Sequence, residues 1–194
     1  MNENTPTPAS TEAASAHTTD NQATGTLTTL PGAPTSRSSV RLERDLPDPP
    51  HQVWRALTDP EELKSWFPTE IAVDRWEVGA RLSFVFPEHE EYNMTGTVLE
   101  CDEPRLLAYT WGDETLRFAL TPTASGGTHL VLFDELAPGI AARNAAGWQL
   151  CLDRLAGHTP SDYAWKPLFA QYTAAFEPTL GPQEGPPKGF EDHA

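Results

Sequence analysis

Two hydrophobic periodicities alternate along the middle of the chain. Apolar residues recur at every second position in residues 38–46, and again in several runs between 69 and 136. This period is typical of half-buried β-strands. Residues 48–67 instead carry apolar side chains at helical spacing, and the Asp-Pro pairs at 48–49 and 59–60 are typical of helix starts. The pattern predicts one strand, two short helices and then an antiparallel meander.

Helical spacing returns in AAGWQLCLDRLAG, residues 145–157. One apolar face is formed by residues at i, i+3, i+4 and i+7: Trp148, Cys151, Leu152 and Leu155. Gly147 interrupts this helix at a cost of roughly 1 kcal/mol relative to alanine, so it needs a structural reason. Either Gly147 leaves room at the mouth of a cavity, or it relieves crowding beside Trp148 in a filled core.

These elements define a fold class. A curved antiparallel sheet needs its concave face covered, and the helix that contains Trp148 is the only apolar surface long enough. We therefore predict an α+β fold in which a curved antiparallel sheet is covered by this helix, and two short helices follow the first strand.

Composition divides the chain into three segments. Residues 1–37 are rich in Thr, Ser, Pro and Ala and carry few large apolar side chains, which predicts a disordered tail. Residues 177–194 are rich in Pro and Gly, which predicts a second, flexible tail. A single domain over 38–176 remains between them.

Charge and hydropathy exclude several partners. The net charge of −15 argues against nucleic acid and anionic membranes, whose phosphates are bound by Lys and Arg. No stretch approaches the roughly 20 apolar residues of a membrane span, and the opening MNENTPTPAS does not have the pattern of a signal peptide. We therefore expect a cytoplasmic protein without a nucleic-acid or membrane partner.

No catalytic or metal-binding motif is visible. The histidines of the predicted domain lie on separate elements without metal-ligand spacing: His51, His89, His129 and His158. Cys101 and Cys151 stand alone and are interpreted as small buried side chains. We therefore predict no metal, no cofactor and no catalytic residue.

Large aromatic rings are more frequent than a small sheet-and-helix layer needs. Rings combined with a few polar groups usually line small-molecule sites, although each single ring can equally belong to the core. Trp66 and Phe67 stand where the second short helix meets a loop, a position expected at a pocket entrance. The candidate ligand-binding residues are Trp66, Phe67, Trp76, Phe84, Phe86, Trp111, Phe118, Asn144 and Trp148. Arg44 and Asp134 are polar residues on strands and could face inward, but such a residue is more often a satisfied edge residue than a ligand contact, and we interpret both in this way.

Four segments, in this order, resemble the bacterial homologues of the activator of heat-shock protein 90 ATPase, in the START-like SRPBCC superfamily. They are PDPPHQVWRALTDPEELKSWF, GTVLECDEPRLLAYTW, GGTHLVLFDEL and AAGWQLCLDRLAG. The resemblance extends over about residues 40–176 and implies a helix-grip fold. In this fold a curved antiparallel sheet of about seven strands wraps around a long C-terminal helix and leaves a cavity between them. Asp134 departs from the resemblance, because many relatives carry a histidine on the last strand.

The predicted function is binding of a small, largely hydrophobic molecule in an internal cavity, without chemical change. One alternative, implied by the family's name, is a chaperone-activator-like module with a protein partner. An exposed apolar patch on the convex face of the sheet would favour this alternative. A second alternative is an enzyme that resembles polyketide cyclases or aromatases, and a buried histidine or acid pair in the cavity would favour it.

Overall fold

The computed structural model describes residues 22–28, 37–87, 89–159 and 165–186. The strands in these ranges are β1 (Thr26–Thr28), β2 (Ser38–Leu46), β3 (Glu70–Ala72), β4 (Arg81–Val85), β5 (Met94–Asp102), β6 (Leu106–Trp111), β7 (Glu114–Pro122) and β8 (Thr128–Leu136). The helices are α1 (Pro50–Thr58), α2 (Pro60–Leu63), α3 (Ala141–Leu155) and α4 (Trp165–Leu180), with 3-10 turns η1 (Glu90–Tyr92) and η2 (Pro138–Ile140).

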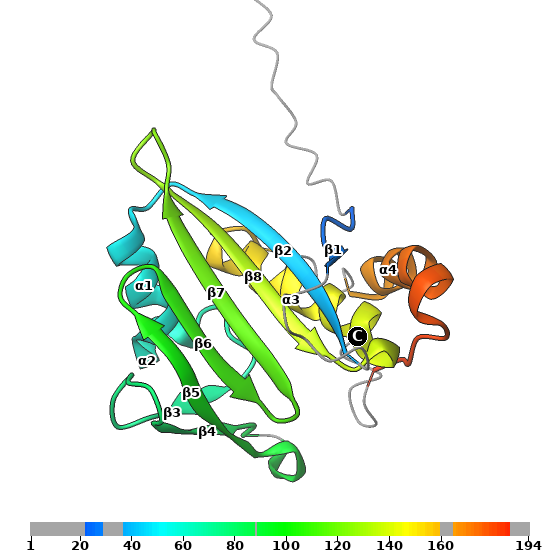
Figure 1. Cartoon of the computed structure of the whole chain (residues 1–194), viewed down its shortest axis with the longest axis horizontal. Coiled ribbons are helices and arrows are strands. Elements are labelled where there is room, and N and C mark those ends of the chain that lie inside the picture. Colours follow the sequence, from blue (N-terminus) through cyan, green and yellow to red (C-terminus); the bar gives the residue numbers. More distant parts are fainter. Residues whose placement is uncertain (1–21, 29–36, 88, 160–164, 187–194) are drawn as a thin grey trace, which may run out of the picture.

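All described strands belong to one antiparallel sheet in the order β1-β2-β8-β7-β6-β5-β4-β3. The sheet covers α3 on one side, α1 and α2 lie at one end, and α4 lies beyond the β1 edge (Figure 1). This arrangement confirms the predicted α+β helix-grip fold. The strand beyond the predicted seven is β1. The helix that the sheet covers is α3, and α4 packs against α3 instead of the sheet.

Local sequence explains most element boundaries. The Asp59 side chain accepts a hydrogen bond from the Glu61 amide at 2.9 Å and so caps α2, as the Asp-Pro pair predicts. The pair at 48–49 predicts the start of α1 less accurately. The helix begins at Pro50, its N-cap is Pro49, and no side chain caps it. Gly96 is required where β5 meets β6, since a Cβ there would lie 2.0 Å from the Thr110 carbonyl oxygen.

The alternation in β2 and β8 places their apolar side chains against α3. Leu42 and Leu132 are opposite each other in the register and fully buried. The helix approaches closely because its inner face is partly alanine, including Ala141 and Ala145, which are also fully buried. None of the helices in the described ranges is both long and apolar enough to cross a bilayer.

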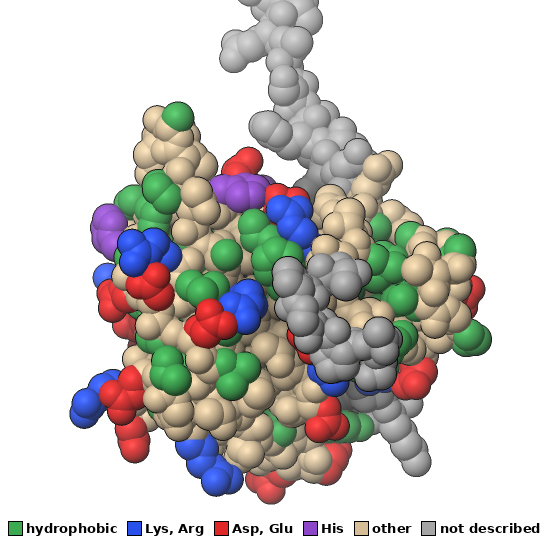
Figure 2. Space-filling model, viewed as in Figure 1, with side chains coloured by type: hydrophobic (Ala, Val, Ile, Leu, Met, Phe, Trp, Pro, Cys, Tyr) green, Lys and Arg blue, Asp and Glu red, His purple; other side chains and the backbone are tan. Residues whose placement is uncertain are grey.

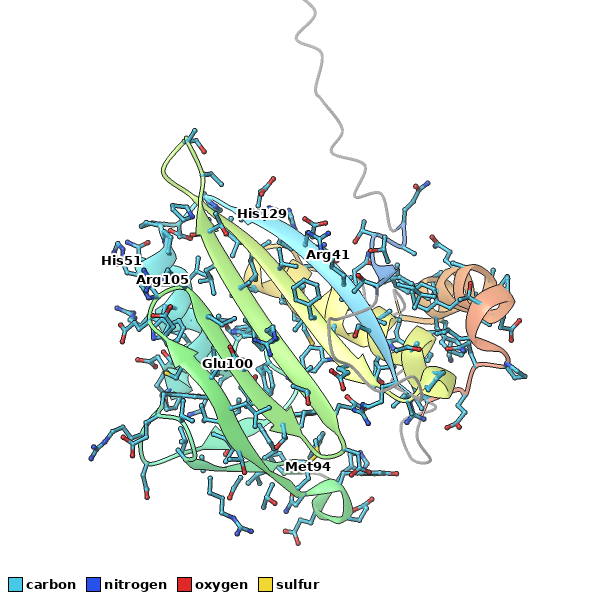
Figure 3. All side chains as sticks on the ribbon, viewed as in Figure 1. Arg41, His51, Met94, Glu100, Arg105 and His129 are labelled. Carbon is cyan, nitrogen blue, oxygen red and sulfur yellow. The ribbon has the colours of Figure 1, made fainter. Side chains whose placement is uncertain are left out.

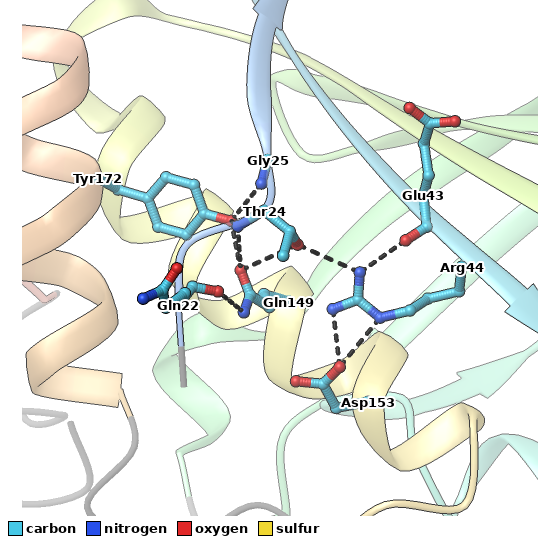
Figure 4. Close-up of polar contacts among 8 residues, drawn as sticks. All are labelled: Gln22, Thr24, Gly25, Glu43, Arg44, Gln149, Asp153 and Tyr172. Atoms are coloured by element: carbon cyan, nitrogen blue, oxygen red, sulfur yellow. Dashed lines mark hydrogen bonds and ion pairs between the residues drawn. The ribbon is translucent and has the colours of Figure 1, made fainter. Parts of the chain in front are cut away.

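The structure differs from the predicted N-terminal tail at residues 22–28. β1 pairs with β2, and the segment before it is fixed by hydrogen bonds to both long helices (Figure 4). The Tyr172 hydroxyl accepts from the Gly25 amide at 2.7 Å, and the Gln149 side chain accepts from the Thr24 amide at 3.1 Å. Such a short polar strand carries no periodicity of its own. The remainder of the predicted tail, 1–21 and 29–36, lies outside the described residues.

The C-terminal boundary also differs from the prediction. α4 extends to Leu180, four residues beyond the predicted domain end at Phe176. The Gln183 side chain then accepts a hydrogen bond from the Ala142 amide at 2.9 Å, in the first turn of α3. Residues 177–186 are therefore part of the packed structure, and 187–194 lie outside the described residues.

Arg44 points toward α3 from a part of β2 that β1 does not pair with, since β1 covers only Ser39–Arg41. Its guanidinium donates to the Asp153 carboxylate through Nε at 2.9 Å and Nη2 at 2.7 Å (Figure 4). Both bonds reach the same oxygen, Oδ1, and hydrogen bonds between charged groups are stronger than neutral ones. This charged residue on an apolar strand face therefore links the sheet to its helix.

Candidate functional site

A pocket of about 740 Å³ opens where α3 begins and where β6 turns into β7. Its volume lies within the range of small-molecule sites. Most of its lining is apolar and comes from several elements: Pro68, Phe86, Tyr92, Met94, Trp111, Ile140, Gly147, Trp148, Cys151 and Trp165. The charged and amide side chains in the lining are Arg37, Asp113, Glu114, Arg143 and Asn144.

The apolar wall is a layer of aromatic rings supported by a second layer. Trp111 and Trp148 meet edge to face, with ring centroids 5.8 Å apart. Behind them lies Phe67, at 5.3 Å from Trp111 and 5.5 Å from Trp148. Phe84 also supports Trp111 at 4.6 Å. Because these contacts fix the rings from behind, the wall is formed before any ligand arrives.

Gly147 lies on the pocket side of α3. A Cβ added at Gly147 would meet no atom within 4 Å. Gly147 therefore does not relieve crowding in a filled core, and the structure favours the first of the two interpretations, a residue that leaves room at a cavity.

The polar end of the pocket is built on a buried carboxyl pair. Asp134 of β8 is fully buried, and its Oδ2 accepts hydrogen bonds from Trp148 Nε1 and Asn144 Nδ2, both at 3.1 Å. Asn144 Nδ2 also donates to Glu114 Oε2 at 2.8 Å, so one amide bridges the two carboxyl groups. Asp134 Oδ1 has no hydrogen-bond partner among the described residues.

Burial changes the protonation of this pair. Loss of water raises the pKa of Glu114 to about 7, against an ordinary value of 4.5, although the Asn144 hydrogen bond opposes the shift. Burial, followed by the neighbouring charge of Glu114, raises the pKa of Asp134 well above its ordinary value. Near neutral pH Glu114 therefore exchanges a proton, and burial favours the protonated form of Asp134 as well.

Two arginines lie close to this pair, but each is already engaged. Arg37 Nε lies 3.2 Å from the Glu135 carboxylate, and its Nη2 donates to the Glu135 carbonyl at 2.7 Å. Arg143 Nη1 lies 3.5 Å from the Glu184 carboxylate. Neither guanidinium forms an ion pair with Glu114 among the contacts of the described residues.

The structure brings together four of the nine predicted ligand-binding residues. Phe86, Trp111, Asn144 and Trp148 line the pocket. The other five belong to the core or its margin: Trp66, Phe67, Trp76, Phe84 and Phe118. The expected entrance position of Trp66 is wrong, because its buried indole donates to the Ala56 carbonyl at 2.9 Å. Phe67 lies one layer behind the wall, and the Trp76 indole donates to the Thr58 carbonyl at 2.8 Å.

Sequence reasoning missed the carboxyl pair. Glu114 is the first residue of β7, directly after the turn at residues 112–113, and no motif in the sequence marks it as a site residue. Asp134 was interpreted as an edge residue, yet β8 lies between β2 and β7, and Asp134 pairs with Leu116 in the register. The alternation of Leu130, Leu132 and Asp134 was the signal that this side chain faces inward. In the described part of the chain, no three His, Cys, Asp or Glu side chains gather as metal ligands would.

A sheet wrapped around one helix, with a pocket between them, defines a helix-grip domain of the START-like class. Within this class, the chain belongs to the family described as Activator of Hsp90 ATPase homolog 1-like protein, whose model matches residues 48–159. The resemblance inferred from the sequence is therefore confirmed at the level of the family.

Solved structures show the same fold. EF2215 from Enterococcus faecalis is 23% identical, with a TM-score of 0.64 over 78% of this chain and 90% of that one. CalU16 from Micromonospora echinospora is 21% identical, with a TM-score of 0.59 over 80% and 95% of the two chains. DynU16, from the dynemicin biosynthetic locus, is 25% identical, with a TM-score of 0.53. The match covers 64% of this chain and 47% of the DynU16 chain. No curated protein matches the chain.

Proposed function

We propose that this protein binds a small, largely apolar organic molecule in the pocket beside α3. The observation that carries the proposal is the pocket itself, about 740 Å³ with a supported wall of aromatic rings. Apolar surface of this kind gains free energy when a ligand removes it from water. A single polar end, at Glu114 and Asn144, would orient the ligand.

A protein-interaction role has less support. In the described ranges, the large hydrophobic side chains with high exposure are Val78 and Leu99. Figure 2 shows the convex face of the sheet, where apolar side chains are interspersed with charged ones. Arg41 lies over the Phe133 ring at 5.9 Å, and both Arg41 and Glu100 lie on this face in Figure 3. The described part of this face therefore offers no broad apolar patch for a partner.

A second candidate function is acid–base catalysis on the bound molecule. The buried carboxyl pair favours it, because a group with a pKa of about 7 exchanges protons readily near neutral pH. Extraction of any molecule that co-purifies with the wild-type protein and with Glu114→Gln would test this candidate. A different mass in the variant supports conversion by Glu114, whereas an identical mass in both contradicts it.

Calorimetric titration with a neutral apolar probe, 2-methylnaphthalene, tests the binding proposal. We expect saturable binding at one site in the wild-type protein. Gly147→Leu should abolish it, because its side chain enters the open space beside Gly147. Gly147→Ala is the matched control, since it removes the helical glycine but adds only a methyl group, and it should keep binding. Absence of binding to wild type, or equal binding to Gly147→Leu, would contradict the proposal.

A further inference from the structure

The charges around the pocket are unevenly matched. Each arginine in the lining has a carboxylate close to it, Glu135 for Arg37 and Glu184 for Arg143. Glu114 also lines the pocket, but its hydrogen-bond partner is the neutral Asn144 amide, which contacts only Oε2. An ionised carboxylate that is largely buried without a cation is costly. Among the described residues, the pocket therefore contains an acidic group whose charge no ion pair compensates.

The charges around Glu114 have both signs. Arg143 and Arg37 act on it from a distance and lower its pKa, whereas Asp113, which precedes it in the β6–β7 turn, raises its pKa. Asp134 is fully buried, and its Oδ1 has no hydrogen-bond partner in the described ranges. The chain as a whole carries a net charge of −15, which attracts cations toward its surface. The overall charge, together with a Glu114 carboxylate that forms no ion pair within the described ranges, favours a cationic ligand group.

The aromatic wall is compatible with the same ligand chemistry. The faces of tryptophan rings attract cations, most strongly where water is excluded. Trp111 and Trp148 both line the pocket, and Trp148 donates to the Asp134 carboxyl that Asn144 links to Glu114. The apolar body of a ligand could therefore lie against these rings while its ammonium group contacts Glu114, because all three residues line the same pocket.

We propose that the pocket selects organic amines, that is, ring-containing apolar molecules with one protonated amino group that contacts Glu114. The apolar body of the ligand would lie against Trp111 and Trp148. This inference rests on the proposed function, because it names the chemical class of the molecule that the same pocket binds.

The inference has a pH signature. An ammonium favours the ionised form of Glu114, whose pKa in the free protein is raised to about 7 by burial. The preference for amines should therefore be strong at about pH 8 and weak at about pH 5.5, where Glu114 holds its proton. At about pH 7, binding of an amine should release protons. Titrations in buffers of different ionisation enthalpy measure this release directly.

Three matched probes test the proposal by calorimetry. They are 2-(aminomethyl)naphthalene, the neutral 2-methylnaphthalene and the anionic 2-naphthylacetate. At about pH 8 we expect the amine to bind wild type about tenfold or more tighter than the neutral probe, as a charged hydrogen bond in a partly buried site allows. The anion should bind most weakly. Preference for the anion would overturn the inference and would assign the polar end to the arginines.

Variants locate the effect at Glu114. Glu114→Gln should reduce the ratio of amine affinity to neutral-probe affinity to about one, because the variant has no carboxylate to pair with the ammonium. Glu100→Gln removes the same charge on the opposite face of the sheet, where Glu100 pairs with Arg117 at 2.6 Å, and should keep the wild-type ratio. An unchanged ratio in Glu114→Gln would contradict the inference, and if this variant does not fold, the three wild-type affinities decide alone. Neutral binding without amine preference overturns only the inference, whereas no binding of any probe overturns the proposed function as well.

Discussion

Replacing Glu114 by glutamine should raise the free energy of unfolding above that of wild type at alkaline pH. At acidic pH the two proteins should be about equally stable. Glutamine keeps an oxygen that can accept the Asn144 hydrogen bond, but it carries no charge to bury. In wild type, burial raises the pKa of Glu114 from 4.5 in the unfolded chain to about 7 in the folded protein. The folded state therefore binds the proton more tightly, and its stability falls as pH rises from about 4.5 through 7.

The size of the effect follows from this shift. Each unit of pKa difference corresponds to about 1.4 kcal/mol, so ionised Glu114 costs wild type up to about 3 kcal/mol at pH 8. Glu114→Gln should recover most of this cost at about pH 8 and little at about pH 4.5. Asp134 stays in both proteins, although its pKa should fall in the variant, because the charge of Glu114 contributes to its rise.

Urea unfolding at several pH values, followed by tryptophan fluorescence, measures this difference. For each protein, the free energy of unfolding at about pH 4.5 is subtracted from that at about pH 8. This change is then compared between the variant and wild type. Glu100→Gln, a change at an exposed ion pair, should follow the wild-type pH profile closely. A Glu114→Gln profile parallel to wild type, or a variant less stable than wild type at pH 8, would refute the account of a buried carboxylate.

The remaining predictions concern the pocket helix and the N-terminal strand. Gly147→Ala should raise the free energy of unfolding by about 0.5–1 kcal/mol in urea, because the added methyl group meets no atom and alanine favours the helix; a loss of stability would show that the space is not open. Tyr172→Phe should cost about 1–3 kcal/mol, since the Gly25 amide loses its acceptor, and a neutral result would deny the N-terminal segment a structural role. A chain that begins at Ser38 should melt clearly lower than one that begins at Gln22, because it lacks β1 and its contacts to Gln149; equal melting temperatures would support a dispensable tail up to residue 37.

The sequence allowed prediction of the fold wherever periodicity was strong. The alternation in β2 and β8 and the apolar face of α3 each predict which side is buried, and two such faces suffice to place a helix on a sheet. β1 could not be predicted, because three polar-flanked residues have no period. Its position depends on the exposed edge of β2 and on side chains of α3 and α4, which are distant in sequence.

The pocket residues were harder to predict than the fold. Trp66 and Trp111 are both tryptophans at the ends of elements, but one indole turns inward to the Ala56 carbonyl while the other ring forms the pocket wall. Residue type cannot distinguish these positions, because both burial and pocket lining favour aromatic rings. Of the two carboxyl groups, only Asp134 could have been recognised from the sequence, because the alternation in β8 places its side chain on the inward face. Glu114 joins it through a turn geometry that a single sequence does not reveal.

Nuclear magnetic resonance of the tryptophan indole N–H signals tests the central claim most directly, because it reports where an apolar molecule binds. Saturation of the wild-type protein with 2-methylnaphthalene should shift the indole signals of Trp111 and Trp148, which line the pocket, together with the Gly147 amide. The indole signals of Trp66 and Trp76, which donate to backbone carbonyls of α1, should stay in place. Saturable shifts at Trp66 and Trp76 without shifts at Trp111 and Trp148, or no shifts at any of them, would contradict a ligand pocket beside α3.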